Sequence, residues 1–345
     1  MSRTDELVRH SGVSRSTVFR FLRGENVRPA ARQSILAAMQ RLNMEPSDYA
    51  VHDGRTILIS VRPAFQTFKG YDLAASGFME RGESYGFRFQ LKAGSALDSI
   101  TEAGARADLA GVLFLGRTIP DEQRESERLT MLGIPHVFVN RVFHDTTTSF
   151  VSVDHRAAAR DAVLHLFDLG FSEVGTWGHT TMFRVNSEKR HGYLRAYEER
   201  GLPKPESCLD FHEHGDLEEA VARLIVEKRL SPAWFAASDE HALRLIKVVR
   251  EHGLSVPDDI SIVGMDDAGQ AEFMNPALTT VHIPFRAAGA AAFDVLKQLV
   301  ENPVESSVRV FMKHNLVVRE SCGSAAMKKG GTAKEDERSK AKARR

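Results

Sequence analysis

The sequence predicts a small all-α helix-turn-helix head joined to an α/β body made of two doubly wound parallel-sheet lobes. The first 46 residues carry short amphipathic patterns with helical spacing. From residue 56 onward, short β-rich runs alternate with amphipathic segments that end in glycine, which is typical of parallel sheets with helices on both faces. With 345 residues, 42% of them hydrophobic, the chain is long enough for more than one packed core.

The head is expected to form helices at about 4–10, 14–23 and 29–42. Gly12 suits a tight turn with positive φ, Ser14 stands where an N-cap belongs, and Pro29 suits a first helical turn. Apolar residues at helical spacing should close a small core: Leu7, Val13, Val18, Leu22, Ile35, Leu36, Met39 and Leu42. The segment "NMEPSDYAVHDGR" breaks the pattern and is predicted to be a linker.

The segment "GVSRSTVFRFLRGE", residues 12–25, carries two different faces if it is helical. Val18, Phe21 and Leu22 fall on one side, and Ser16, Arg20 and Arg23 fall opposite. A helix, a turn with glycine and a second helix with a polar N-terminus have the spacing of a DNA-binding helix-turn-helix. The alternative is an ordinary helical cap whose arginines are merely solvated.

The body is expected to contain strands within seven β-rich runs: "TILISV", "FRFQLKA", "GVLFLG", "PHVFVN", "SEVGTW", "AWFAAS" and "ISIVGM". Helices are expected within "LAASGFMERGESYG", "AAARDAVLHLFDLG", "SEKRHGYLRAYEERG" and "HALRLIKVVREHG". These elements suffice for two lobes, although no internal repeat is visible. Because parallel sheets bind ligands at the carboxyl ends of their strands, a ligand is expected in a cleft between the lobes.

Charge and composition narrow the classes of function. The net charge is zero, but residues 1–49 carry +3 and residues 328–345 carry +5, which leaves the body near −8. A basic head on an acidic body suits a localised contact with phosphates. The chain has no apolar run of about eighteen residues and no secretory signal, so we expect a cytoplasmic protein without membrane contact. Two cysteines are too few for a disulfide framework.

Enzyme and metal motifs are weak. The run "FHEHGD" places His212 and His214 at a spacing seen in metal sites, but we interpret it as a loop or strand edge. The sequence contains no glycine-rich phosphate loop. We therefore expect no catalytic residues, no metal and no cofactor.

Several longer motifs resemble the lac-repressor (LacI/GalR) family of bacterial transcription regulators. "GVSRSTVFRFL" matches the family signature Gly-Val-Ser-x-x-Thr-Val-Ser-Arg-Val-Leu, and "VPDDISIVGMDD" followed by "NPALTTV" is highly specific. "VSVDHRAAARDAVLHLFDLGFSEVG" and "NLVVRESC" also fit. The resemblance extends from about Thr4 to Cys322.

The resemblance implies a ligand-responsive, sequence-specific DNA-binding regulator, most often a repressor, that acts as a homodimer on a near-palindromic operator. It implies a helix-turn-helix domain at 1–46, a hinge at 47–55 and a two-lobed, periplasmic-binding-protein-like effector and dimerisation domain at 56–322. Lobe crossovers are expected near 154, 284 and 313, and a disordered basic tail at 323–345. The implied effector is a small sugar-like molecule between the lobes. The alternatives are an activator, a corepressor-dependent regulator, and, from other classes, a solute-binding protein or an enzyme.

The resemblance also assigns residues. Arg15 and Ser16 match positions that choose bases, Arg20 matches the signature arginine, and Thr4, Ser14 and Thr17 match positions that touch phosphates. Arg23 is the remaining residue expected to bind DNA. Phe19 and Arg23 replace the usual Ser and Asn. Lys189 stands in place of an arginine that holds the effector, with Arg184 and Arg190 as nearby substitutes. The implied effector-binding residues are Asp154, Arg184, Lys189, Ser238 and Asp266.

The hinge departs from the family pattern. Relatives commonly carry Ala-Arg-x-Leu there, and the leucine wedges into the minor groove. In this chain Val51 replaces the arginine and Asp53 replaces the leucine, with Tyr49 as the one residue able to intercalate instead. Because a carboxylate would face phosphates rather than unstack bases, we predict a weak or absent DNA kink.

Overall fold

The computed structural model of the chain describes residues 3–22, 27–44, 55–61, 69–101, 108–116, 122–145, 147–180, 184–204, 208–211, 217–301 and 307–323. Two compact units are present. The first comprises Met1–Val139, Asp145–Val151 and Arg286–Arg309, and the second comprises Asn140–His144, Ser152–Phe285 and Val310–Arg345. Each unit contains one sheet, so the predicted two-lobed α/β architecture is confirmed.

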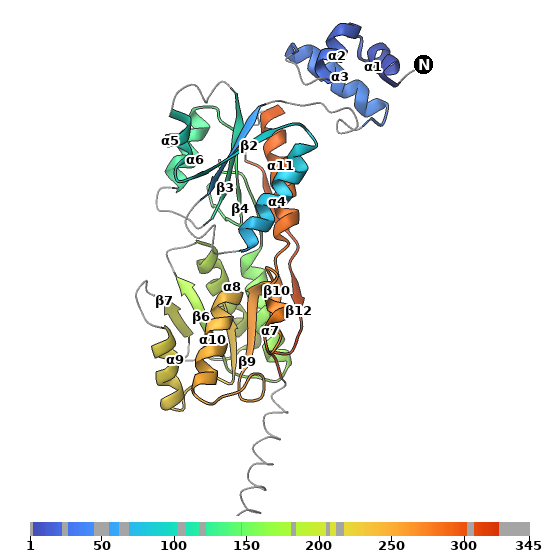
Figure 1. Ribbon diagram of the computed structural model, residues 1–345. Helices are drawn as coiled ribbons and strands as arrows, with labels where there is room; N and C mark the ends of the chain where they lie inside the picture. Colours follow the sequence, from blue (N-terminus) through green and yellow to red (C-terminus); the bar gives the residue numbers. More distant parts are fainter. Residues whose placement is uncertain are drawn as a thin grey trace, which may run out of the picture. The chain divides into compact units, whose positions relative to one another are not determined.

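The helical head consists of α1 (Arg3–Ser11), α2 (Arg15–Leu22) and α3 (Pro29–Arg41), as Figure 1 shows in blue. Gly12 has a φ of 65°, and the amide of Thr17 donates to Ser14 Oγ at 3.3 Å, so the predicted turn and N-cap are confirmed. The core expected from the sequence is present, with Phe21, Ala38 and Met44 as additional buried members.

The first sheet has the strand order β2-β1-β3-β4-β5-β11 among the described residues. Strand β1 pairs in parallel with β2 and β3, and the parallel pairing continues through β4 to β5. Helices α4 and α11 lie on one side of this sheet and α5 and α6 on the other (Figure 1). The elements are β1 (Thr56–Val61), α4 (Lys69–Glu83), β2 (Arg88–Ala93), α5 (Ala96–Thr101), β3 (Leu109–Leu115), α6 (Glu122–Met131), β4 (His136–Val139), β5 (Phe150–Val153), α11 (Phe285–Glu301) and β11 (Arg309–Met312).

The second sheet has the order β7-β6-β8-β9-β10-β12 in the described part of the chain. Its pairs are parallel except for the edge strand β12, which runs antiparallel to β10. Trp177 and Trp234 are fully buried in the core against α9 and α10. The elements are α7 (His155–Asp168), β6 (Val174–Thr180), α8 (Arg184–Arg200), β7 (Cys208–Phe211), α9 (Leu217–Val226), β8 (Ala233–Ala236), α10 (Asp239–Glu251), β9 (Ser261–Asp266), the 3-10 helix η2 (Ala271–Phe273), β10 (Thr279–His282) and β12 (Asn315–Val317).

The two sheets have the same strand order, a repeat that the sequence does not reveal. Strand β1 reads "TILISV", whereas its counterpart β6 reads "VGTWGHT", so topology is shared without shared residues. All seven predicted strands and the four predicted body helices are confirmed. Strands β5, β7, β10, β11 and β12 were not predicted. Short strands are hard to recognise from alternation alone, although β4 and β8, which also have four residues, lie in runs that the sequence did indicate.

Candidate functional site

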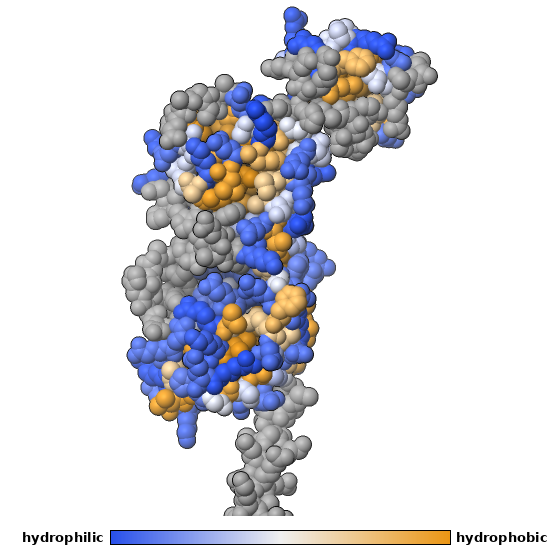
Figure 2. Space-filling view, in the orientation of Figure 1, coloured by the Kyte–Doolittle hydropathy of each residue, from blue (hydrophilic) through white to orange (hydrophobic). Residues whose placement is uncertain are grey.

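The exposed face of α2 carries the side chains expected to read DNA. Arg15, Ser16 and Arg20 are exposed, whereas Val18 and Phe21 are buried, as the helical spacing predicts. Thr4 lies half-buried on α1, and Arg23 lies outside the described residues. Hydrophilic and hydrophobic side chains share the visible face of the head (Figure 2).

Three hydroxyl groups gather at the N-terminus of α2. Ser14 Oγ lies 2.8 Å from Thr17 Oγ1 and 3.1 Å from Ser16 Oγ. The free amides and the dipole of a helix N-terminus favour an anion, and hydroxyl groups add donors for phosphate oxygens. This end of α2 is therefore suited to a phosphate contact.

A second polar site lies at the carboxyl ends of β8 and β9 in the second unit. Asp266 is the last residue of β9, and its carboxylate lies 3.9 Å from Nζ of Lys189 on α8. Lys189 Nζ also donates to the carbonyl oxygen of Ala237, just beyond β8, at 2.6 Å. Both charged side chains are only 6% exposed. The structure thus brings together two of the five predicted effector residues.

Burial shifts the pKa values of both members of this pair. It raises the pKa of Asp266 to about 8, although the charge of Lys189 opposes that rise. Burial also lowers the pKa of Lys189, against the attraction of Asp266 and Asp239. Asp266 has a φ of 132°, a backbone conformation that side chains rarely adopt. Strained backbone and shifted pKa values are features that cluster at functional sites, so this pair is a candidate.

Asp239 completes the cluster, although it was not among the predicted site residues. Its carboxylate accepts hydrogen bonds from Thr280 Oγ1 at 2.5 Å and from the amide of Asp267 at 2.7 Å, and burial raises its pKa to about 6. A Cβ at Gly264 would lie 2.4 Å from Asp239 Oδ1, so the glycine makes room for this carboxylate. Its place just after β8 was the signal available in the sequence.

The remaining neighbours of the cluster are paired. Asp267 Oδ1 accepts from Arg319 at 2.8 Å, and Asp267 Oδ2 lies 3.0 Å from His282 Nδ1. These contacts tie the loop after β9 to the segment after β12. Asp266 is thereby held between a fixed loop and a buried lysine.

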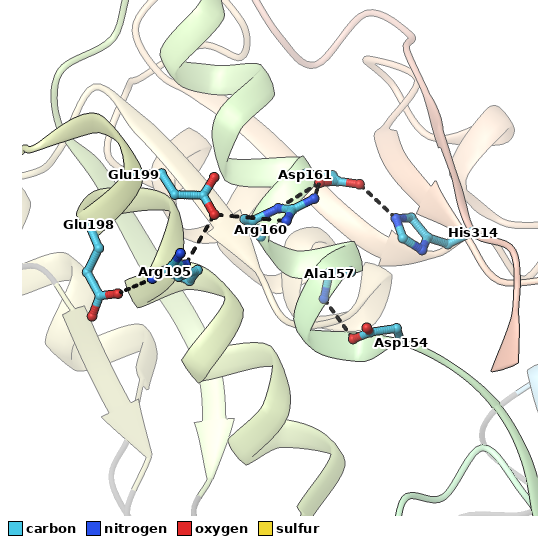
Figure 3. A network of polar contacts seen from close by, with 8 residues as sticks. All are labelled: Asp154, Ala157, Arg160, Asp161, Arg195, Glu198, Glu199 and His314. Carbon is cyan, nitrogen blue, oxygen red and sulfur yellow. Dashed lines mark hydrogen bonds and ion pairs between the residues drawn. The ribbon is translucent and has the colours of Figure 1, made fainter. Parts of the chain in front are cut away.

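Two predicted effector residues cap helices. Asp154 is exposed and accepts from the amide of Ala157 at 2.9 Å at the start of α7, as Figure 3 shows. Ser238 accepts from the amide of His241 at 3.2 Å at the start of α10. Capping accounts for both residue types without a ligand. Arg184 is exposed at the first position of α8.

The polar network of Figure 3 joins the helices of the second unit. Arg160 on α7 contacts Asp161 at 2.7 Å and Glu199 of α8 at 3.9 Å, and Asp161 contacts His314 at 2.9 Å. Arg195 contacts Glu199 at 3.2 Å. Of these ion pairs, Arg160–Glu199 links α7 to α8, the helix that carries Lys189.

No helix among the described residues is long and apolar enough to cross a membrane. No group of three or more His, Cys, Asp or Glu residues in the same ranges could hold a metal ion, and His212 and His214 lie outside them.

Known proteins share this organisation. Residues 163–322 match the periplasmic binding protein-like domain family. The HTH-type transcriptional regulator MalR of Streptomyces coelicolor is 33% identical over 348 residues, covering 95% of this chain and 99% of that protein. The transcriptional regulator CelR–cellobiose complex is 26% identical with a TM-score of 0.67, covering 93% and 100% of the two chains. The lac repressor dimer bound to operator and the anti-inducer ONPF is 20% identical with a TM-score of 0.67, covering 94% and 99%.

A helix-turn-helix head that precedes two parallel-sheet lobes in the sequence defines a class of transcription regulators rather than enzymes. The chain belongs to the LacI/GalR family of helix-turn-helix transcription regulators. The family resemblance inferred from the sequence is thereby confirmed.

Proposed function

We propose that the protein is a homodimeric repressor that binds operator DNA in the cytoplasm and responds to a small sugar-like effector. The main support for an effector site is the buried Asp266–Lys189 pair, in which Asp266 has a strained backbone at the end of β9. A carboxylate accepts hydrogen bonds from two sugar hydroxyls, and a lysine donates to further oxygens. The relative CelR in complex with cellobiose supports a sugar.

The DNA half rests on the exposed face of α2. Arg15, Ser16 and Arg20 are proposed to contact base edges, since arginine recognises guanine through a bidentate pair of hydrogen bonds. Thr4, Ser14, Thr17 and Arg23 are proposed to contact phosphates. The proposed domains are 1–46 for DNA, 47–55 for the hinge, 56–322 for effector binding and dimerisation, and 323–345 for the tail.

Effector and operator are proposed to be coupled through the arrangement of the lobes. A ligand shifts a conformational equilibrium only by its difference in affinity for the two states. The effector must therefore prefer one arrangement of the lobes, and that arrangement sets the spacing of the two heads on the half-sites. By reciprocity, operator DNA changes the affinity for the effector by the same factor.

The test combines a thermal-shift screen of mono- and disaccharides, cellobiose included, with operator binding by the full-length chain. A sugar that binds only the folded protein raises its melting temperature. Asp266→Asn should weaken binding of that sugar by about 5- to 100-fold and leave operator binding without sugar unchanged. Asp258→Asn, an exposed neighbour before β9, is the matched control. If Asp266→Asn binds the sugar as tightly as the control does, Asp266 is not in the site.

A further inference from the structure

Arg15 does not stand alone at the start of α2. One of its terminal nitrogens lies 3.2 Å from a carboxylate oxygen of Asp5 on α1. The side chain of Arg15 is 68% exposed and that of Asp5 is 35% exposed, so the pair lies on the surface of the head. An exposed ion pair adds little to stability, and its effect on the position of the guanidinium matters more.

The ring of Phe19 holds the same guanidinium from a second direction. The central carbon of the Arg15 guanidinium lies 5.7 Å from the centre of the Phe19 ring, one helical turn further along α2. Phe19 is 38% exposed, although burial of a large aromatic side chain is favourable. Its contact with Arg15 gives this unusual residue a role.

The two contacts do not use all the donors of the guanidinium. Asp5 engages one terminal nitrogen, and the contact with the Phe19 ring uses no hydrogen bond, so other donors of the fork remain available. A free arginine side chain must lose rotamer freedom before it forms a bidentate contact, and a side chain that is already held loses less. Asp5 and Phe19 thus restrict Arg15 before DNA arrives.

We propose that Asp5 and Phe19 are positioning residues that set the sequence specificity of Arg15. This proposal rests on the proposed function, in which Arg15 contacts a base. In this proposal Asp5 does not contact a base itself and acts only by positioning the guanidinium of Arg15. Its negative charge also repels phosphates, so it disfavours the alternative in which Arg15 turns toward the DNA backbone.

The experiment starts from the operator that the full-length, unaltered chain selects out of a pool of randomised DNA duplexes. Affinities for this operator and for all its single base-pair variants are then measured by fluorescence anisotropy. Arg15→Ala identifies the base pair that Arg15 reads, where discrimination should fall by about 5- to 150-fold. Asp5→Asn should lower discrimination at that base pair by about 2- to 10-fold and leave discrimination at the other base pairs unchanged.

Matched variants separate positioning from simple electrostatics. Glu6→Gln removes the same charge one residue further along α1, so it should raise nonspecific DNA affinity as much as Asp5→Asn does but leave discrimination intact. Phe19→Ser should lower discrimination at the Arg15 base pair, whereas Phe19→Tyr keeps the ring and should preserve it. Equal melting temperatures would show that the variants fold.

Three outcomes are decisive. The positioning role of Asp5 is overturned if Asp5→Asn leaves discrimination at the Arg15 base pair unchanged. It is also overturned if Asp5→Asn lowers that discrimination no more than Glu6→Gln does. An effect of Phe19→Ser at a base pair other than the one read by Arg15 shows that Phe19 contacts DNA itself and overturns its part. If Arg15→Ala retains full discrimination at every position, the proposed base contact fails first, and the positioning role with it.

Discussion

Replacing Lys189 by methionine should destabilise the second unit in a pH-dependent way. The two charges of the Lys189–Asp266 pair are 3.9 Å apart and almost fully buried. At an effective dielectric constant of about 20, two unit charges at that distance attract by about 4 kcal/mol. We expect an interaction energy of about 2–4 kcal/mol in a double-mutant cycle with Asp266→Asn at pH 8 and above, where Asp266 becomes ionised and loss of Lys189 leaves its charge uncompensated.

The sign of the pH dependence follows from Asp266. Its pKa in the folded protein is already raised to about 8, and loss of Lys189 raises it further. Between the unfolded pKa of about 4 and this value, the folded state holds a proton that the unfolded state has lost. Stability should therefore fall as pH rises from 5 to 8 by up to about 1.4 kcal/mol per unit, both in the unaltered chain and in Lys189→Met. The fall in the unaltered chain should level off near pH 8, whereas that of Lys189→Met should continue.

Urea unfolding at pH 5, 6, 7 and 8 measures both effects. Lys247 and Glu251 on α10 form a matched exposed pair at 3.7 Å, and a cycle with Lys247→Met and Glu251→Gln should give about 0.5 kcal/mol or less. The double variant Lys189→Met/Asp266→Asn should lack the dependence of stability on pH that Asp266 causes. A buried cycle no larger than the exposed one, or a stability of Lys189→Met that does not vary with pH, refutes the reasoning.

Two further predictions concern other parts of the chain. Burial lowers the pKa of His136, so the unfolded state takes up a proton first as pH falls below about 6.5, and stability should fall by up to about 1.4 kcal/mol per pH unit. Urea unfolding between pH 7 and 5 should show a shallower slope for His136→Gln, and an unchanged slope would contradict this. The hinge with Val51 and Asp53 should bend operator DNA by less than about 40° in a fluorescence-transfer assay, and a larger bend abolished by hinge changes would show that a wedge persists.

The sequence was informative where structure is local. Helical spacing, the Ser14 cap and the turn at Gly12 are set by neighbouring residues, so the head could be derived from them. Long β-rich runs were recognised for the same reason. Short strands such as β5 and β10 depend on partners distant in the chain, and nothing within four residues identifies them.

The candidate sites were harder to derive because they depend on tertiary contacts. The sequence motif pointed to Asp266 and Lys189, but only the fold shows that they form a buried pair. It gave no sign that Asp5 reaches Arg15 from another helix. Asp154 and Ser238 match family positions, yet their hydrogen bonds are those of helix caps.

One short segment near the end of the described residues supplies an edge strand to each of the two sheets. Strand β11 joins β5 in the first sheet and β12 joins β10 in the second, and only residues 313 and 314 separate the two strands. A ribosome that has made residue 308 has therefore completed neither sheet, so the final folding step of both lobes must follow the release of the same few residues. A protein truncated there would expose the open edges of β5 and β10, and such edges are templates for aggregation.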